Sequence, residues 1–245
     1  MGNMFQKVQP IKLYIICDID EILVWQTPKW CRMLYDQYKD DPIMNKYLVL
    51  DPLLYEKDII LSRGEYYLNK WLANPDIPIE DIPKEINEVI LEVCNTADFY
   101  DDLKPTKMGR ALQTLCNSTK VAKIYFISKG EDNLAWESKK RFMDNYFNFG
   151  DKSELIRVPL DKPKSEYINK FIPNRDKINV IIDDLPKNIF DILDNSLQDN
   201  KEVAVLCPDL GYSLLMEMQK GNFTDEQLEE YDKNFRDIQI YEALD

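Results

Sequence analysis

Two aspartates near the N-terminus, Asp18 and Asp20, are the residues whose types and spacing most suggest chemistry. They follow the apolar stretch that begins at Leu13, and only one residue separates them. In an extended chain their side chains would lean to the same side, where two like charges repel each other unless a cation lies between them. The alternative is a pair of solvated acids at the end of a strand, because aspartates are mostly exposed.

Three further groups of polar side chains come directly after later apolar stretches. Ser128 ends one stretch, Lys162 and Lys164 follow a shorter one, and Asp183 and Asp184 end another. Ligands of open parallel sheets bind beyond the carboxyl ends of the strands, so all these side chains would gather at one edge. Acids that converge there favour a divalent cation, while a hydroxyl and an ammonium group suit an anionic ligand.

Each of these later residues also has a purely structural interpretation. Ser128 could cap the end of its strand, and Asp184 could be the N-cap of the helix that follows it as well as a metal ligand. Lys164 falls in the first turn of a helix predicted to begin at Pro163, whereas Lys162 precedes that proline, and this placement favours Lys164 for an anion site. Either lysine could instead be a solvated surface residue.

The composition excludes several classes of chemistry. The chain has no histidine, which excludes His-dependent catalytic triads, His-ligated zinc or iron, and phosphohistidine intermediates. Its net charge of −13 argues against an extended nucleic-acid groove but allows a small phosphorylated ligand beside a metal. The five cysteines are widely spaced and contain no Cys-x-x-Cys, so we expect neither a disulfide framework nor a zinc site.

Apolar runs alternate with amphipathic segments along the chain, a pattern that predicts an α/β fold. Strands separated by helices imply a doubly wound, Rossmann-like parallel sheet with right-handed crossovers. Gly150 is expected to end the helical segment 132–147, and Thr224 with Gln227 resembles a capping box that opens a C-terminal helix. The predicted strands lie at Leu13–Cys17, Val121–Ser128, Leu155–Val158, Ile178–Ile182 and Val203–Cys207.

Residues 25–116 carry mostly helical signals and predict a helical cap inserted into a core made of residues 1–24 and 117–245. Aromatic side chains in or beside the insert could stack on a base, although packing in the core is their more common role. The helical signals lie at Pro28–Tyr38, Glu65–Leu72, Glu85–Val93 and Met108–Leu115. The aromatic candidates are Trp25, Trp30, Tyr66, Tyr67 and Trp71. Two arginines, Arg32 and Arg63, could also reach a ligand.

No apolar run approaches the roughly eighteen residues of a membrane span, and the first ten residues lack the apolar region of a signal peptide. We therefore expect an intracellular, cytoplasmic protein without a membrane partner. The sequence does not indicate an oligomeric state.

The polar groups resemble, in the same order, the four motifs of the haloacid dehalogenase-like hydrolases. The first motif is similar to Asp18-Ile19-Asp20-Glu21-Ile22-Leu23, the second to Ser128 after its strand, the third to a lysine, and the fourth to Ile182-Asp183-Asp184. The motif-bearing core covers roughly residues 11–24 and 116–208. A helical insert between the first two motifs is similar to the cap of many of these enzymes, and the layout resembles that of 5′-nucleotidases, including deoxyribonucleotidases.

This resemblance implies a Mg²⁺-dependent phosphomonoesterase that acts on (deoxy)nucleoside monophosphates. Asp18 would be the nucleophile that forms an aspartyl-phosphate, and Asp20 would be the general acid and base. Ser128 would bind the phosphoryl oxygens, and Lys164 would offset the charge shared by the nucleophile and the phosphate. The metal ligands implied are Asp18, the backbone carbonyl of Asp20, Asp183 and Asp184.

Two residues depart from the family pattern. Family members commonly carry glycine and threonine where this chain has Glu21 and Ile22, so we expect an additional negative charge near the site. A sugar phosphate or a polynucleotide 3′-phosphate end is an alternative substrate. Another alternative is a non-catalytic binding protein that keeps the fold; Glu21 favours it, but binding alone would not require Asp20.

Overall fold

The computed structural model describes residues 12–51, 73–74, 76–198, 203–209 and 235–239. These residues contain a six-stranded sheet with the strand order β3-β2-β1-β4-β5-β6, in which every adjacent pair is parallel. The predicted doubly wound α/β sheet is therefore confirmed, with β1 at the point where the strand order reverses. The strands are β1 (Leu13–Cys17), β2 (Val121–Lys129), β3 (Ser153–Val158), β4 (Val180–Ile182), β5 (Ala204–Asp209) and β6 (Phe235–Gln239).

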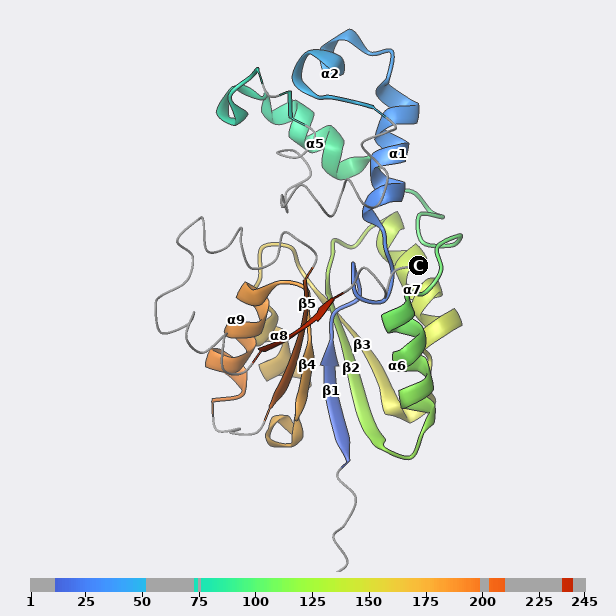
Figure 1. Ribbon diagram of the computed structural model, residues 1–245, viewed down its shortest axis with the longest axis vertical. Helices are drawn as coiled ribbons and strands as arrows, with labels where there is room; N and C mark the ends of the chain where they lie inside the picture. The colour runs from blue at the N-terminus through green and yellow to red at the C-terminus, as the bar shows by residue number, and fades with distance from the viewer. Residues whose placement is uncertain (1–11, 52–72, 75, 199–202, 210–234, 240–245) are drawn as a thin grey trace, which may run out of the picture.

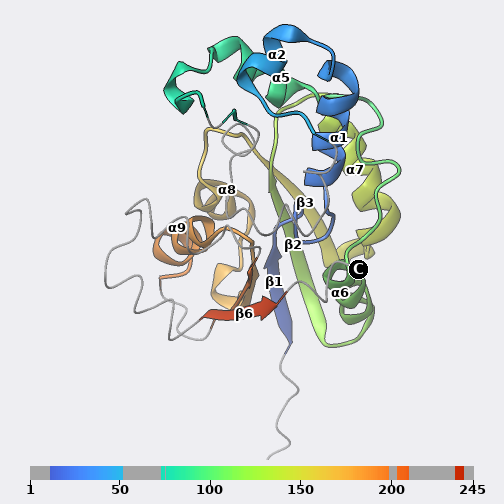
Figure 2. The same cartoon turned by 45° about the horizontal axis from the view of Figure 1, so that its top comes forward.

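Helices cover both faces of the sheet, as Figures 1 and 2 show. On β1, Ile15 and Cys17 belong to a buried cluster with side chains of α6 (Lys107–Asn117) and α7 (Leu134–Phe147). Ile16 belongs to a second cluster with side chains of α8 (Lys164–Phe171) and α9 (Pro186–Ser196). Successive residues of a strand point to opposite faces, so an uninterrupted apolar strand such as β1 suits a sheet that is buried on both sides.

Three further α-helices of the described residues lie beyond the carboxyl ends of the strands (Figure 1), and we call them the cap helices: α1 (Thr27–Tyr38), α2 (Pro42–Tyr47) and α5 (Lys84–Glu92). They share a hydrophobic cluster of their own, whereas α6 packs on the sheet. The cap boundaries at residues 25 and 116 remain a proposal. The buried members of the cap cluster are Cys31, Leu34, Met44, Leu48, Ile82, Ile86, Ile90 and Val93.

The two segments that connect the cap helices to the sheet lie side by side. We call residues 18–26 the first linker and residues 93–106 the second linker. The backbone N–H of Thr106 donates to the Leu23 carbonyl at 2.9 Å, and its hydroxyl donates to the Ile22 carbonyl at 2.6 Å. An isolated antiparallel bridge joins Val24 to Pro105. The cap helices therefore leave and rejoin the core at one place, next to the end of β1.

Several local predictions need correction. Helix α7 ends at Phe147 with Asn148 as its C-cap, and Gly150, with φ 60°, begins a 3-10 helix three residues later. Neither β6 nor α2 was predicted from the sequence, although the N-cap Asp41 followed by Pro42 is a helix-start signal for α2.

Several predicted features lie outside the described residues. These are the helix at Glu65–Leu72, the C-terminal helix, and the candidates Arg63, Tyr66, Tyr67 and Trp71. No helix in the described part of the chain is long and apolar enough to span a membrane.

Candidate active site

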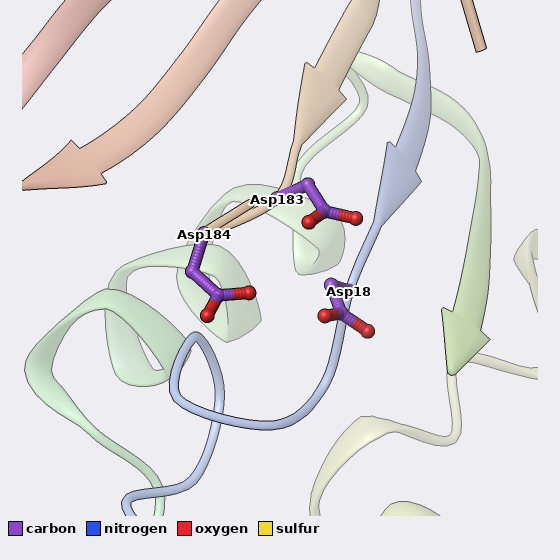
Figure 3. Close-up of side chains that lie close together, drawn as sticks. All are labelled: Asp18, Asp183 and Asp184. Atoms are coloured by element: carbon purple, nitrogen blue, oxygen red, sulfur yellow. The ribbon is translucent and has the colours of Figure 1, made fainter. Parts of the chain in front are cut away.

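Three aspartates converge at the carboxyl ends of two adjacent strands. Asp18 follows β1, Asp183 and Asp184 follow β4, and Figure 3 shows their carboxylates facing one common space. One carboxylate oxygen from each lies within 4.8 Å of the other two, and all three residues are buried. The parallel register that pairs Cys17 with Ile182 puts these aspartates at the same level of the sheet.

The ammonium group of Lys164 faces these carboxylates. Lys164 begins α8, and its Nζ lies 2.9 Å from Asp18 Oδ1 and 2.6 Å from Asp183 Oδ2, with only 2% of the side chain exposed. Burial lowers the pKa of Lys164, but the attraction of Asp18 and Asp183 outweighs burial and raises it above its usual value. Lys162 is exposed, so the structure places Lys164 against the carboxylates, as the sequence favoured.

The pKa values show that one lysine does not neutralise this group. Burial raises the pKa of Asp18 to about 6, an effect that Lys164 partly offsets and Asp183 reinforces. Burial also raises the pKa of Asp184 well above its usual value, and the charge of Asp18 adds to this rise. Buried carboxylates with raised pKa values are in an unfavourable state that a bound cation would relieve.

The orientation of Asp183 is fixed by the start of α9. Its Oδ1 accepts hydrogen bonds from the Leu185 backbone N–H at 2.9 Å and from Asn188 Nδ2 at 3.0 Å. The N-cap of α9 is Leu185, which makes no side-chain cap hydrogen bond. The N-cap interpretation of Asp184 was therefore wrong, and its carboxylate belongs to the group of three.

Asp20 occupies a different environment from Asp18. Its Oδ2 accepts from Lys139 Nζ at 2.5 Å and from Ser128 Oγ at 3.1 Å, and Lys139 Nζ also donates to Ser128 Oγ at 2.9 Å. The hydroxyl of Tyr100 donates to the other oxygen, Oδ1, at 2.7 Å. The carboxylate of Asp20 is not part of the group that Asp18, Asp183 and Asp184 form among the described residues. Asp20 instead has its own positive partner, and Ser128 is part of that network.

Three residues of this site were not predicted from the sequence. Lys139 lies on the buried face of α7, Tyr100 lies in the second linker, and Asn188 lies in the first turn of α9. Asn188 contacts Asp183, five residues earlier, across the turn that joins β4 to α9, so the spacing of residues within a helix does not predict this contact. For Lys139 and Tyr100 nothing in the local pattern indicated that they meet Asp20, since both contacts depend on packing between distant segments.

Glu21 does not add the negative charge that we expected. It is buried, with φ 59° in the left-handed region, and its Oε1 accepts from the backbone N–H of Thr27 at 3.1 Å and from the Thr27 hydroxyl at 2.6 Å. Burial raises its pKa to about 8, although the Thr27 hydrogen bond works against this rise. Glu21 is therefore mostly protonated at pH 7 and ties the first linker to the start of α1. Ile22 is buried in the cluster that includes α6 and α7.

The aromatic candidates of the cap have structural contacts. Trp30 donates its indole N–H to the Ile90 carbonyl at 2.8 Å, which joins α1 to α5. Trp25 packs against the cap cluster, and its buried indole nitrogen has no hydrogen-bond partner within the described residues. Arg32 is exposed on α1. Among the described aromatic side chains, the indole of Trp25 is thus the buried donor that lacks a partner.

The donor set fits a hard divalent cation such as Mg²⁺. Mg²⁺ takes oxygen ligands, usually one or two carboxylates together with water and substrate phosphate oxygens. Asp18, Asp183 and Asp184 supply carboxylate oxygens within reach of one centre. Burial raises the pKa values of Asp18 and Asp184, and a bound cation would favour their charged forms. Ser128 on β2 and Lys139 on α7 both contact Asp20, and their hydroxyl and ammonium groups are donors that suit an anion.

Comparisons with known proteins add no argument about activity. No family model matches the sequence, and no curated protein matches it. Two solved structures resemble the chain with a TM-score of 0.49: a candidate phosphatase from Clostridium difficile, 16% identical over 91% of this chain and 99% of that one, and a haloacid dehalogenase-like hydrolase from Streptococcus pneumoniae, 10% identical over 94% of this chain and 96% of that one.

Proposed function

We propose that the protein is a Mg²⁺-dependent phosphomonoesterase of the haloacid dehalogenase-like type, working through an aspartyl-phosphate. One observation carries this proposal: Asp18 and Asp20, separated by one residue, have different partners. Asp18 lies with the acidic group and Lys164, and Asp20 lies with Ser128 and Lys139. Two carboxylates held apart in this way suit a division between a nucleophile and an acid–base group.

Asp18 is the proposed nucleophile. One of its oxygens attacks phosphorus in line with the leaving oxygen, the bond between phosphorus and that oxygen breaks, and the phosphoryl group is transferred to the aspartate. Lys164, in contact with Asp18 and Asp183, offsets negative charge as the phosphoryl group arrives. Burial around the carboxylates excludes water from this first step.

Asp20 is the proposed acid–base group. In the first step its proton passes to the leaving oxygen, and in the second step it takes a proton from the water that attacks phosphorus and releases Asp18. The side chain of Asp20 keeps 20% of its surface exposed, so a substrate oxygen can approach it. Ser128 and Lys139 fix its position, and we assign them as donors to the phosphoryl oxygens.

Mg²⁺ would be held by Asp18, Asp183 and Asp184, together with the backbone carbonyl of Asp20. When bound, it would supply positive charge against the phosphoryl oxygens and relieve the repulsion among the carboxylates. Asn188 would keep Asp183 turned toward it.

We propose (deoxy)nucleoside monophosphates as the substrate class. One feature supports this choice: the cap helices stand over the strand ends, where they suit a substrate that has a part beyond the phosphate for them to contact. The net charge of −13 favours a small substrate over a nucleic-acid strand. Sugar phosphates and polynucleotide 3′-phosphate ends are the competing substrates, and a protein that binds without catalysis is the competing function.

A panel of phosphomonoesters tests the proposal. We expect hydrolysis with added Mg²⁺, loss of activity with EDTA, and loss of activity in Asp18→Asn, which keeps the size of the side chain but is a poor nucleophile. Lys162→Ala is the matched control because this exposed lysine precedes the site and touches none of its carboxylates. Hydrolysis that persists in Asp18→Asn would contradict the aspartyl-phosphate, and an inactive wild type across the panel would support the binding protein.

A further inference from the structure

Asp20 is held by groups from three separate parts of the fold. Ser128 comes from β2, Lys139 comes from α7, and Tyr100 comes from the second linker, which rejoins the cap helices to the core. The first two belong to the framework of the sheet and its covering helix. Tyr100 is different, because its hydroxyl reaches Asp20 from the segment between the cap helices and α6.

The ring of Tyr100 is firmly packed, so only a movement of the linker backbone would displace its hydroxyl. The residue is 3% exposed, and its backbone N–H donates to Ser138 Oγ at 2.7 Å. Its ring makes an edge contact with Phe99, with centroids 5.1 Å apart, and a tilted contact with Phe142 at 6.2 Å. Ser138 and Phe142 lie on α7, the helix that also presents Lys139 to Asp20.

The same hydroxyl also contacts the first linker. Tyr100 Oη lies 2.8 Å from Gln26 Oε1 and 2.7 Å from Asp20 Oδ1, yet a phenol has only one proton to donate. If the Gln26 amide turns so that its N–H donates to the phenol oxygen, the Tyr100 hydroxyl donates its own hydrogen bond to Asp20. Each of the three side chains then has a hydrogen-bond partner of the right kind. Gln26 is the N-cap residue of α1, so this chain of hydrogen bonds runs from the first cap helix to Asp20.

We propose that Tyr100, held by Gln26, is a positioning residue that orients the carboxylate of Asp20 for proton transfer while the two linkers lie together. This inference rests on the proposed phosphomonoesterase activity and assigns it a dependence on the cap attachment. If the linkers separate, Asp20 Oδ1 loses its donor and the carboxylate is held through Oδ2 alone. A misplacement of about 1 Å is enough to slow a reaction of this kind strongly.

Comparing substrates with different leaving groups distinguishes a positioning role of Tyr100 from a purely structural one. When the bond between phosphorus and the leaving oxygen breaks, an alkoxide needs the proton of Asp20, whereas a nitrophenolate is stable enough to leave without it. The ratio kcat/KM covers the steps up to the departure of the leaving group, so hydrolysis of the aspartyl-phosphate does not mask the effect. A positioning role of Tyr100 therefore predicts a loss that is selective for alkyl phosphates.

The experiment compares wild type, Tyr100→Phe and Gln26→Ala on a nucleoside 5′-monophosphate and on para-nitrophenyl phosphate, with Mg²⁺ present. For Tyr100→Phe we expect kcat/KM to fall about tenfold or more on the alkyl ester and less than about twofold on the aryl ester. Gln26→Ala should show the same selectivity with a smaller loss. Tyr146→Phe is the matched control, because Tyr146 packs on the same Phe142 ring at 5.1 Å but its hydroxyl contacts Lys104.

Equal losses on both esters, or no loss on the alkyl ester, would overturn the positioning role and leave the phosphatase proposal standing. If wild type hydrolyses neither ester, both proposals fall. Thermal unfolding checks that each variant folds, and if Tyr100→Phe does not, Gln26→Ala decides by the same criterion.

Discussion

Replacing Glu21 with glutamine should change how the stability of the protein depends on pH. In the wild type, burial raises the pKa of Glu21 from its ordinary value of 4.5 to about 8. The folded state thus holds this proton more tightly than the unfolded state, so the stabilising effect is complete below pH 4.5 and is lost as the pH rises through 8. Glutamine has the same shape, keeps an oxygen for Thr27 and does not titrate.

The size of the effect follows from the pKa difference. One pKa unit corresponds to about 1.4 kcal/mol, so the difference between 4.5 and about 8 sets an upper limit of about 5 kcal/mol. Between pH 5 and pH 8 the free energy of unfolding of the wild type should fall by about 3 kcal/mol relative to Glu21→Gln. Asp18 and Asp184 also titrate, but they are present in both proteins and their effects largely cancel in the difference.

Urea denaturation at pH 5, 6, 7 and 8 with EDTA in every sample measures this difference. Glu131→Gln is the matched control, since the Glu131 side chain is exposed and this variant should follow the wild type at every pH. If the free energy of unfolding depends on pH in the same way in the wild type and in Glu21→Gln, Glu21 is not protonated in the folded protein. Glu21 would then carry the additional negative charge that the sequence predicted.

Three further predictions concern the carboxylate site. Lys164→Met should abolish phosphatase activity and lower the free energy of unfolding, measured by urea denaturation, by about 3 kcal/mol. The reason is that Asp18 and Asp183 lose the buried ammonium group that contacts them. The control variant Lys162→Met changes an exposed lysine and should behave as wild type. Because the pKa values of Asp18 and Asp184 are raised, Mg²⁺ binding should release protons, and the affinity should increase as the pH rises from 5 to 8. Calorimetry in buffers of different ionisation enthalpy measures the proton release. Equal heats of binding in all buffers would contradict these pKa shifts. Asn188→Leu should weaken Mg²⁺ affinity about tenfold in the same titration while the fold persists, and an unchanged affinity would show that its hydrogen bond to the carboxylate is dispensable.

The sequence predicted the architecture because its main signals are local. An uninterrupted apolar run such as Leu13–Cys17 suits only a strand buried on both faces, and alternation with amphipathic helices implies parallel connections. The predicted strands at 121–128 and 178–182 appear as β2 and β4, with the polar residues at their carboxyl ends. The strand β6 was not predicted, because Phe-Arg-Asp-Ile-Gln carries only a weak local pattern.

The sequence by itself also named most of the site: Asp18, Asp20, Ser128, Asp183 and a choice between two lysines. Parallel strands bring their carboxyl ends to one edge, so residues that follow strands can be expected to meet. Whether they act as nucleophile, acid–base group and metal ligands stays a prediction.

Only the tertiary structure decided how these residues are divided and what state they are in. It separated Asp20 from the acidic group and gave it Lys139 and Tyr100, which come from segments more than seventy residues away. It also buried Glu21 and so raised its pKa to about 8, whereas the sequence alone suggested a charged side chain at pH 7. Charge state and hydrogen-bond partners depend on burial and on contacts between distant segments, and a local pattern contains neither.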